Sequence, residues 1–181
     1  MANQAISSFL SFDDEVKNVL VIGPANGAIS YAPIVSSYLQ KYFRTIKFRH
    51  GRTQLDKNDK HYIAEKHKAL IDISDTFIIV EDIVNQGTTI KEVSAILPKQ
   101  VNSVLCLVDR GNNSAENLGI EQFFPFLRVN MDQYDPRKNA SLFESEMKIN
   151  TTLGKGNIWV EQFGQPPYGD DVDFSTFSLL K

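Results

Sequence analysis

The hydrophobic residues of this chain fall into short, dense runs, with stretches of helical spacing between them. Three runs stand out, NVLVIG at 18–23, TFIIV at 76–80 and VNSVLCLV at 101–108, and all are rich in β-branched residues without strict polar alternation. Strands that are buried on both faces of a parallel sheet have this pattern. We therefore expect three central strands, with further strands at 45–48 and 126–129.

The segments between these runs have the spacing of amphipathic helices. Apolar residues recur every three or four positions within 29–43 and 88–97, and a third helix is expected at 114–123. Strands that alternate with helices imply right-handed crossovers. The fold class predicted is α/β, a doubly wound, mostly parallel sheet with ligands at the carboxyl ends of its strands.

The pattern changes after residue 132. Residues 133–181 combine several glycines and prolines with aromatic residues and lose the regular spacing. The 181 residues, 42% of them hydrophobic, are enough for one good core but short for two ordinary domains. We expect a single domain over 1–181, with a core at about 17–132 and an irregular C-terminal appendage at 133–181.

The composition indicates the cellular location of the chain and the chemistry of its cysteine. No apolar run approaches the ~20 residues of a bilayer span, and the N-terminus lacks the basic start of a secretory signal. We expect a soluble, cytoplasmic protein without a membrane partner. The single cysteine, Cys106, lies within an apolar run, so we expect a small core residue. One cysteine excludes a disulfide framework or a cysteine metal site within the chain.

Positive charge is concentrated in one segment of an otherwise acidic chain. Between residues 41 and 68 lie nine of the 19 Lys and Arg and all three His, although the net charge is -3. A local positive field favours a small polyanion such as a phosphorylated metabolite. The acidic remainder argues against nucleic acid as a partner. A solvated, lysine-rich loop is the alternative.

The segment TFIIVEDIVNQGTTIKEV carries the most specific chemistry. A buried strand delivers Glu81 and Asp82, and a short polar turn then opens a helix. Carboxylates at a strand end can accept hydrogen bonds from the hydroxyls of a ribose. Gly87 permits close backbone approach, and the hydroxyls of Thr88 and Thr89 lie where the positive end of the helix dipole attracts an anion. The unit fits both ends of a ribose 5-phosphate.

VEDIVNQGTT resembles the signature with which type I phosphoribosyltransferases bind phosphoribosyl pyrophosphate (PRPP). The resemblance implies that Glu81 and Asp82 bind the ribose hydroxyls. It also implies a loop for the 5-phosphate made of Val84, Asn85, Gln86, Gly87, Thr88 and Thr89. A bare acidic pair followed by glycine also occurs in ordinary strand-end turns.

A second turn, in GPANGAIS, follows the first strand. In this family the equivalent turn wraps the pyrophosphate, and Ala25, Asn26 and Gly27 occupy the matching positions. This stretch of sequence is similar to the corresponding stretch of orotate phosphoribosyltransferases, some of which carry a lysine where this chain has Gly27. A tight turn before a helix explains the same glycines.

The basic segment FRHGRTQLDKNDKHYIAEKHK has the length and charge of a catalytic lid. A mobile basic loop would neutralise the leaving pyrophosphate and exclude water. Its candidate catalytic residues, by resemblance to the orotate enzymes, are Arg52, Lys57, Lys60 and His61. The segment departs from the orotate pattern because Lys60 and His61 are adjacent and no glycine follows them.

Arg110, in VLCLVDRGNN, is the candidate for the base site. In the orotate enzymes the corresponding arginine faces the base, where a guanidinium suits a carboxylated pyrimidine. An ion pair with Asp109 or a neighbouring acid is the alternative for this side chain. Trp159 or Phe163 could stack on the base in place of the N-terminal hood that orotate enzymes have, although tail aromatics usually serve packing.

The resemblance implies an Mg-PRPP-dependent transferase that joins a nucleobase, orotate first, to ribose 5-phosphate. Mg²⁺ would be held mainly by PRPP, with Glu81 and Asp82 as further candidate ligands. The resemblance also suggests a homodimer. A purine-type enzyme is the alternative, although Asn85 replaces the aspartate that 6-oxopurine enzymes use to handle a proton. A non-catalytic PRPP-binding regulator and another doubly wound domain, such as a flavodoxin-like one, also stay open.

Overall fold

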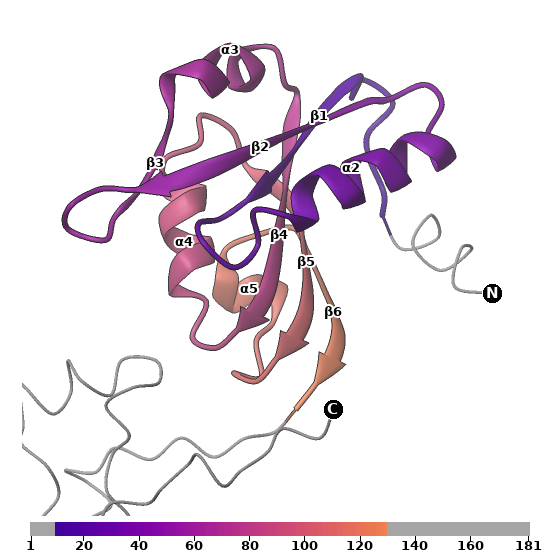
Figure 1. Ribbon diagram of the computed structural model, residues 1–181. Helices are drawn as coiled ribbons and strands as arrows, with labels where there is room; N and C mark the ends of the chain where they lie inside the picture. Colours follow the sequence, from indigo (N-terminus) through magenta and orange to yellow (C-terminus); the bar gives the residue numbers. More distant parts are fainter. Residues whose placement is uncertain (1–9, 130–181) are drawn as a thin grey trace, which may run out of the picture. The chain divides into compact units, whose positions relative to one another are not determined.

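A single six-stranded sheet with helices on both faces forms the part of the chain that the structure, a computed structural model, describes, residues 10–129 (Figure 1). The strand order is β3-β2-β1-β4-β5-β6. The strands are β1 (Asn18–Gly23), β2 (Lys47–Leu55), β3 (His61–Ile63), β4 (Thr76–Val84), β5 (Val101–Asp109) and β6 (Gln122–Arg128). The helices are α2 (Tyr31–Tyr42), α3 (Glu65–Asp72), α4 (Thr88–Ala95) and α5 (Ala115–Leu118).

The chain winds outward in two directions from the centre of this sheet. From β1 it passes to β2 and β3, then returns to place β4 on the other side of β1 and continues through β5 to β6. All neighbouring strands are parallel except the pair β2 and β3. The predicted α/β fold with a doubly wound, mostly parallel sheet is therefore confirmed. The strand order reverses between β1 and β4, which is where such sheets bind ligands.

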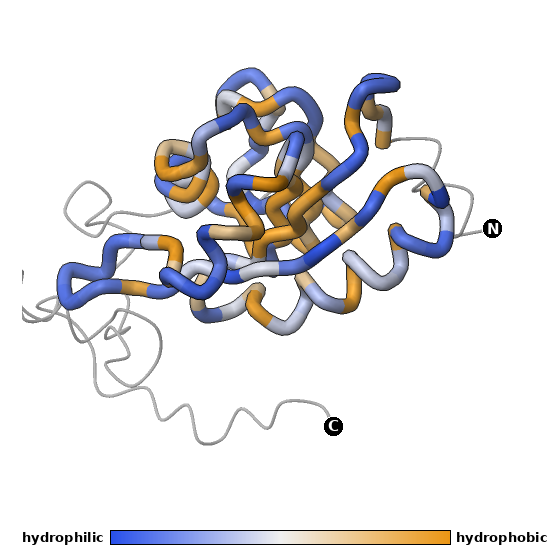
Figure 2. The backbone as a smooth tube through the Cα atoms, turned by 90° about the horizontal axis from the view of Figure 1, so that it is seen from above, coloured by the Kyte–Doolittle hydropathy of each residue, from blue (hydrophilic) through white to orange (hydrophobic). Residues whose placement is uncertain are grey.

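Two hydrophobic clusters hold the sheet between its helices. One joins residues such as Leu20, Ile79 and Val104 to buried side chains of α3, α4 and α5. The other joins alternate residues of the same strands, such as Val21, to α2. Figure 2 shows the apolar strands at the centre, between hydrophilic loops. Because both faces of the central strands are covered, these strands are continuous apolar runs.

The predicted elements differ from the observed ones mainly at their ends. The first strand spans 18–23 as expected, but β4 continues past residue 80 to Val84. The helix expected at 114–123 covers only 115–118, which is a correction. Ser114 starts this short helix with a capping box, and Gly119 ends it in the left-handed region at φ 71°. The chain then enters β6 at Gln122.

The segment expected to be a lid loop is largely ordered secondary structure, which is a second correction. β2 is longer than the strand expected at 45–48, because it pairs first with β1 and then, from Thr53 to Leu55, with β3. The side chain of Asp56 closes the turn, since its Oδ1 accepts the N–H groups of Asn58 at 2.8 Å and Lys60 at 2.9 Å. We call β2, the turn 56–60 and β3 the basic hairpin.

The chain divides into two units, Met1–Met131 and Asp132–Lys181. The expected appendage at 133–181, with Trp159 and Phe163, lies outside the described residues. Within residues 10–129, no helix has both the length and the apolar character needed to cross a bilayer.

Candidate functional site

The acidic pair lies where β4 no longer has β1 as its neighbour. The ladder between β1 and β4 ends at the pair Ile22 and Ile79, whereas β5 stays paired with β4 as far as Val84. Beyond Ile79, β4 therefore has a strand neighbour on one side only. Glu81 and Asp82 lie in this half-paired stretch, where the strand order reverses. The sheet topology thus places both acids at the switch point between β1 and β4, where such sheets bind ligands.

Glu81 is a buried acid. Its side chain is 9% exposed, and its Oε2 atom has no hydrogen-bond partner among the described residues. The Oε1 atom accepts a long hydrogen bond of 3.3 Å from the N–H of Asp82. Burial, and to a lesser extent the neighbouring Asp82, raise the pKa of Glu81 to about 8. The carboxyl group therefore carries a proton at neutral pH in this structure.

Asp82 lies against the turn that follows β1. A Cβ atom added at Gly27 would overlap the carboxylate of Asp82, so any larger residue at this position requires that carboxylate to move. The carboxylate itself is partly exposed and accepts the N–H of Ile83 at 2.8 Å. The acidic pair and the turn at 25–27 therefore belong to one site.

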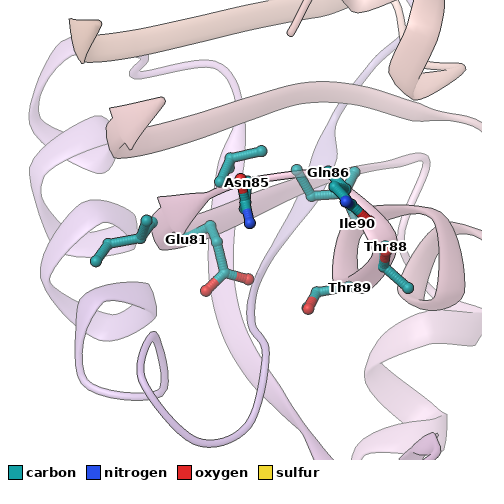
Figure 3. Close-up of a pocket in the computed structure, with 9 residues that line it drawn as sticks. Glu81, Asn85, Gln86, Thr88, Thr89 and Ile90 are labelled. Carbon is teal, nitrogen blue, oxygen red and sulfur yellow. The ribbon is translucent and has the colours of Figure 1, made fainter. Parts of the chain in front are cut away.

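The loop after β4 forms a small hollow at the start of α4. The hollow measures about 190 Å³, and it is lined by Glu81 and by all residues from Ile83 to Ile90. Figure 3 shows the Glu81 carboxylate on one side of it and the hydroxyl of Thr89, on the first turn of α4, on the other. Gly87 precedes the helix at φ 70°, a left-handed conformation that glycine adopts freely. The unpaired N–H groups at a helix start suit an anion here.

The neighbouring loop after β5 packs against residues 84–89, the predicted binding loop for the 5-phosphate, which we call the phosphate loop. Asp109 is 1% exposed, and its carboxylate accepts the N–H of Gly111 at 3.1 Å and that of Asn113 at 3.0 Å. The side-chain amide of Asn113 also donates to the carbonyl of Asn85 at 2.7 Å. The loop conformation at Asn85 is therefore tied to a buried carboxylate. The ion-pair partner of Asp109 is Arg128, at 3.5 Å.

The turn after β1 is anchored to β2. The peptide bond between Ala25 and Asn26 is cis. The N–H of Ala25 donates to Oγ1 of Thr53 at 3.0 Å, and Thr53 is completely buried. This hydrogen bond fixes the amide at the entrance of the turn.

The four candidate lid residues all lie on the basic hairpin. Arg52 is at the end of the β1–β2 ladder, opposite Gly23, and His61 is on β3. Lys57 and Lys60 are exposed in the hairpin turn. Burial lowers the pKa of His61, and Glu92 on α4 opposes this shift. None of the four lines the hollow beside Glu81.

Arg110 is exposed at the end of β5, and its backbone N–H donates to the carbonyl of Val84 at 2.9 Å. Its side chain is not among those that line the hollow at the phosphate loop. A larger, apolar hollow of about 580 Å³ lies between α2 and strands β4, β5 and β6. Glu81 lines both hollows. The apolar one also contains Tyr31, Leu107 and Phe126.

Cys106 is a core residue, as predicted. Its side chain is buried on β5, and burial raises the pKa of the thiol to about 12. The thiolate is therefore scarce at physiological pH, which excludes a role as nucleophile.

A family model matches the part of the chain that contains the acidic pair and the turns after β1 and β4. The model of the phosphoribosyl transferase domain matches residues 1–113, more than half of the chain. The chain therefore belongs to the phosphoribosyl transferase domain family. No curated protein matches its sequence.

Solved structures of purine phosphoribosyltransferases resemble the chain at low identity. The hypoxanthine enzyme of Trypanosoma cruzi is 13% identical, with a TM-score of 0.43 over 71% of this chain and 70% of that one. The HGPRT-ase of Leishmania tarentolae in complex with GMP is 12% identical, with a TM-score of 0.43 over 71% of this chain and 70% of that one. The adenine enzyme of Trypanosoma brucei is 8% identical, with a TM-score of 0.44 over 75% and 67%.

Three residues that shape this site were missed by the sequence prediction. Thr53, Asp109 and Asn113 act through backbone groups of the turn and the phosphate loop. Thr53 lacks a sequence signal, because a threonine within a polar strand is unremarkable. Asp109 and Asn113 lie in DRGNN, where four polar residues and a glycine directly after a buried strand do indicate a structured turn.

Proposed function

We propose that this chain is an Mg-PRPP-dependent phosphoribosyltransferase. In the proposed reaction, the bond between C1 of the ribose and the pyrophosphate oxygen breaks and a bond from C1 to a nitrogen of a nucleobase forms. The proton of that nitrogen passes to water or to the released pyrophosphate. One observation carries this proposal. At the switch point, the acidic pair lies against both turns that we propose to bind anions. Asp82 lies against Gly27 of the first turn, and Glu81 lines the hollow of the second.

The proposed roles follow the spacing of these groups. The start of α4, with Thr88 and Thr89, binds the 5-phosphate. Glu81 and Asp82 accept hydrogen bonds from the ribose hydroxyls, and the turn at 25–27 binds the pyrophosphate. The remaining members of the phosphate loop, Val84, Asn85, Gln86 and Gly87, shape the backbone around the phosphate.

Magnesium fits this site as a companion of the ligand. The described residues contain no group of three or more His, Cys, Asp or Glu that could hold a metal. Asp82, whose carboxylate is partly exposed beside the turn, suits a single contact to an ion that phosphate oxygens and water mainly hold. When bound, magnesium would neutralise charge that develops on the leaving pyrophosphate.

For the base we propose an uncharged purine ahead of orotate. Orotate is an anion, and Arg128, the basic residue that lines the larger apolar hollow, is already paired with the buried Asp109 at 3.5 Å. Leu107 and Phe126, 44% and 90% exposed at this hollow, offer instead an apolar surface on which an aromatic ring can lie. Arg110, the residue that favoured orotate, is exposed and does not line this hollow.

A base panel tests the proposal. Pyrophosphate release from Mg-PRPP is measured with hypoxanthine, guanine, adenine and orotate in turn. Turnover with a purine supports the proposal, and turnover with orotate alone would contradict the choice of base.

The companion measurement is PRPP binding by the Asp82→Asn variant. Loss of the charged acceptor should weaken binding about tenfold, because a hydrogen bond to a charged group contributes ~1.5–3 kcal/mol. Equal PRPP affinity in the wild type and the variant, or no binding by the wild type, would overturn the assignment of the site.

A second function is PRPP sensing without turnover. It is favoured by the position of Lys57 and Lys60, which are exposed in the hairpin turn and do not line the hollow. A sensor would bind PRPP in calorimetry and release no pyrophosphate with any base. The same panel therefore separates the two functions.

A further inference from the structure

The hydroxyl group of Thr53 contacts both Ala25 and His61, which are distant from each other in the sequence. Thr53 is completely buried on β2, one residue beyond the point where Arg52 pairs with the last residue of β1. Its Oγ1 atom accepts the N–H of Ala25 at 3.0 Å. One side of this hydroxyl therefore holds the entrance of the turn at 25–27.

The other side of the same hydroxyl meets β3, the second strand of the basic hairpin. Oγ1 of Thr53 lies 2.9 Å from Nδ1 of His61, which is on β3. A threonine hydroxyl has one hydrogen and two lone pairs, so it can bond both partners at once. The hydrogen bonds thus run from Ala25 through Thr53 to His61 and join three segments.

The hairpin at the end of this path is held together by its own backbone hydrogen bonds. β2 and β3 pair from Thr53 and Ile63 to Leu55 and His61. The backbone N–H of Asp56 donates to the carbonyl of Lys60 at 3.0 Å, which closes the turn. A displacement of the hairpin therefore reaches His61, and through it the hydroxyl of Thr53.

We propose that Thr53 is a positioning residue that couples the basic hairpin to the turn at 25–27. This inference rests on the proposed function, in which that turn binds the pyrophosphate half of PRPP. When the hairpin lies in its observed place, His61 orients the Thr53 hydroxyl, and the hydroxyl orients the Ala25 amide. Affinity for pyrophosphate then depends on Thr53, whereas affinity for ribose 5-phosphate, bound by the acidic pair and α4, does not.

Two variants of Thr53 test this coupling. Thr53→Val keeps the shape of the side chain and removes the hydroxyl, whereas Thr53→Ser keeps the hydroxyl. Calorimetry with magnesium pyrophosphate and, separately, with ribose 5-phosphate measures each half of the site. We expect the valine variant to lose about tenfold in pyrophosphate affinity. Its ribose 5-phosphate affinity should stay unchanged, and the serine variant should recover most of the loss.

Two calorimetric outcomes would overturn the proposal. One is a valine variant that binds pyrophosphate as the wild type does. The other is an equal loss for both ligands, which would indicate general damage to the fold.

A ligand-free measurement keeps the coupling separate from the proposed function. In ¹⁵N NMR spectra, His61→Phe should shift the amide resonance of Ala25, because it removes the partner of the Thr53 hydroxyl. The amide of Asn18, which donates to Asp75 at 2.8 Å at the far end of β1, should not shift and serves as the control.

If the wild type binds neither ligand, the proposed function fails, and the NMR result alone decides the coupling. An unchanged Ala25 resonance in His61→Phe would show that the hairpin and the turn are independent.

Discussion

At the scale of single residues, the environment of Glu81 changes its chemistry most. The side chain lies just beyond the end of the ladder between β1 and β4, and the neighbouring Asp82 adds negative charge. A carboxyl group that is both buried and close to another acid binds its proton more tightly. The consequence is measurable in the stability of the free protein.

The sign of the effect follows from the two pKa values. The pKa of Glu81 is about 8 in the folded protein, above the ~4.3 of an unfolded chain. The stability that this group contributes is therefore complete below about pH 4 and is lost as the pH rises toward 8. Above that range, folding requires a buried carboxylate.

We predict that Glu81→Gln is more stable than the wild type at alkaline pH. Glutamine removes the buried charge, so the gain at pH 8.5 should be on the order of 2 kcal/mol, with little difference at pH 4.5. Urea unfolding at the two pH values measures it. The exposed Glu15→Gln serves as the control and should show no such gain. A wild type that equals or exceeds Glu81→Gln at pH 8.5 would contradict the raised pKa.

The sequence predicts the position of Glu81 but not this property. The order of apolar strand, two acids, polar pair and glycine is local, so it can be seen in VEDIVNQGTT. Burial depends on which strands lie beside β4, and on where β1 stops pairing with it. That information comes only from the assembled sheet.

At the scale of elements, the phosphate loop depends on the loop after β5. A Cβ atom at Gly111 would overlap the carbonyl of Asn85, and Asn113 donates to the same carbonyl. The two loops thus pack backbone against backbone. Any side chain at Gly111 must push the phosphate loop away.

We predict that Gly111→Ala weakens binding of ribose 5-phosphate by about tenfold or more, because the displaced loop no longer surrounds the phosphate. Isothermal titration calorimetry measures the affinity. Gly51→Ala is a suitable control, since its added Cβ would meet the side chain of Leu20 at an ordinary 3.6 Å. Unchanged affinity in Gly111→Ala would show that the loop after β5 plays no part in holding the phosphate loop.

The elements themselves were predictable where the chain is buried on both faces. β1 begins and ends at the expected residues because its run of branched apolar side chains has no polar interruption. The basic hairpin was not predicted, since its strands are polar and its order depends on Asp56 and on pairing with β1. Polar edge strands have little local signal of their own.

At the scale of the whole molecule, the site combines the loops that follow the two central strands, β1 and β4. The turn at 25–27 follows β1, and the phosphate loop follows β4. These strands are neighbours in the sheet, although α2, β2, β3 and α3 separate them in the chain. A ligand that contacts both turns therefore binds only the completed sheet.

We predict that Mg-PRPP raises the unfolding temperature by about 5–10 °C at a concentration of ~100 times Kd, since such a concentration stabilises by ~2.7 kcal/mol. Differential scanning fluorimetry measures the shift. The Asp82→Asn variant should require a higher PRPP concentration for the same rise. An equal rise with ribose 5-phosphate alone, at the same total concentration as PRPP, would show that the second turn takes no part.

The crossover between β1 and β4 also affects how the chain acquires its activity during folding. Pairing of β4 with β5 joins segments that are close in sequence, whereas pairing of β4 with β1 closes a long loop and is entropically slower. A refolding chain should accordingly recognise the two halves of PRPP separately before it recognises the whole molecule. Recovery of affinity for intact PRPP would then mark the moment at which the central strands come together.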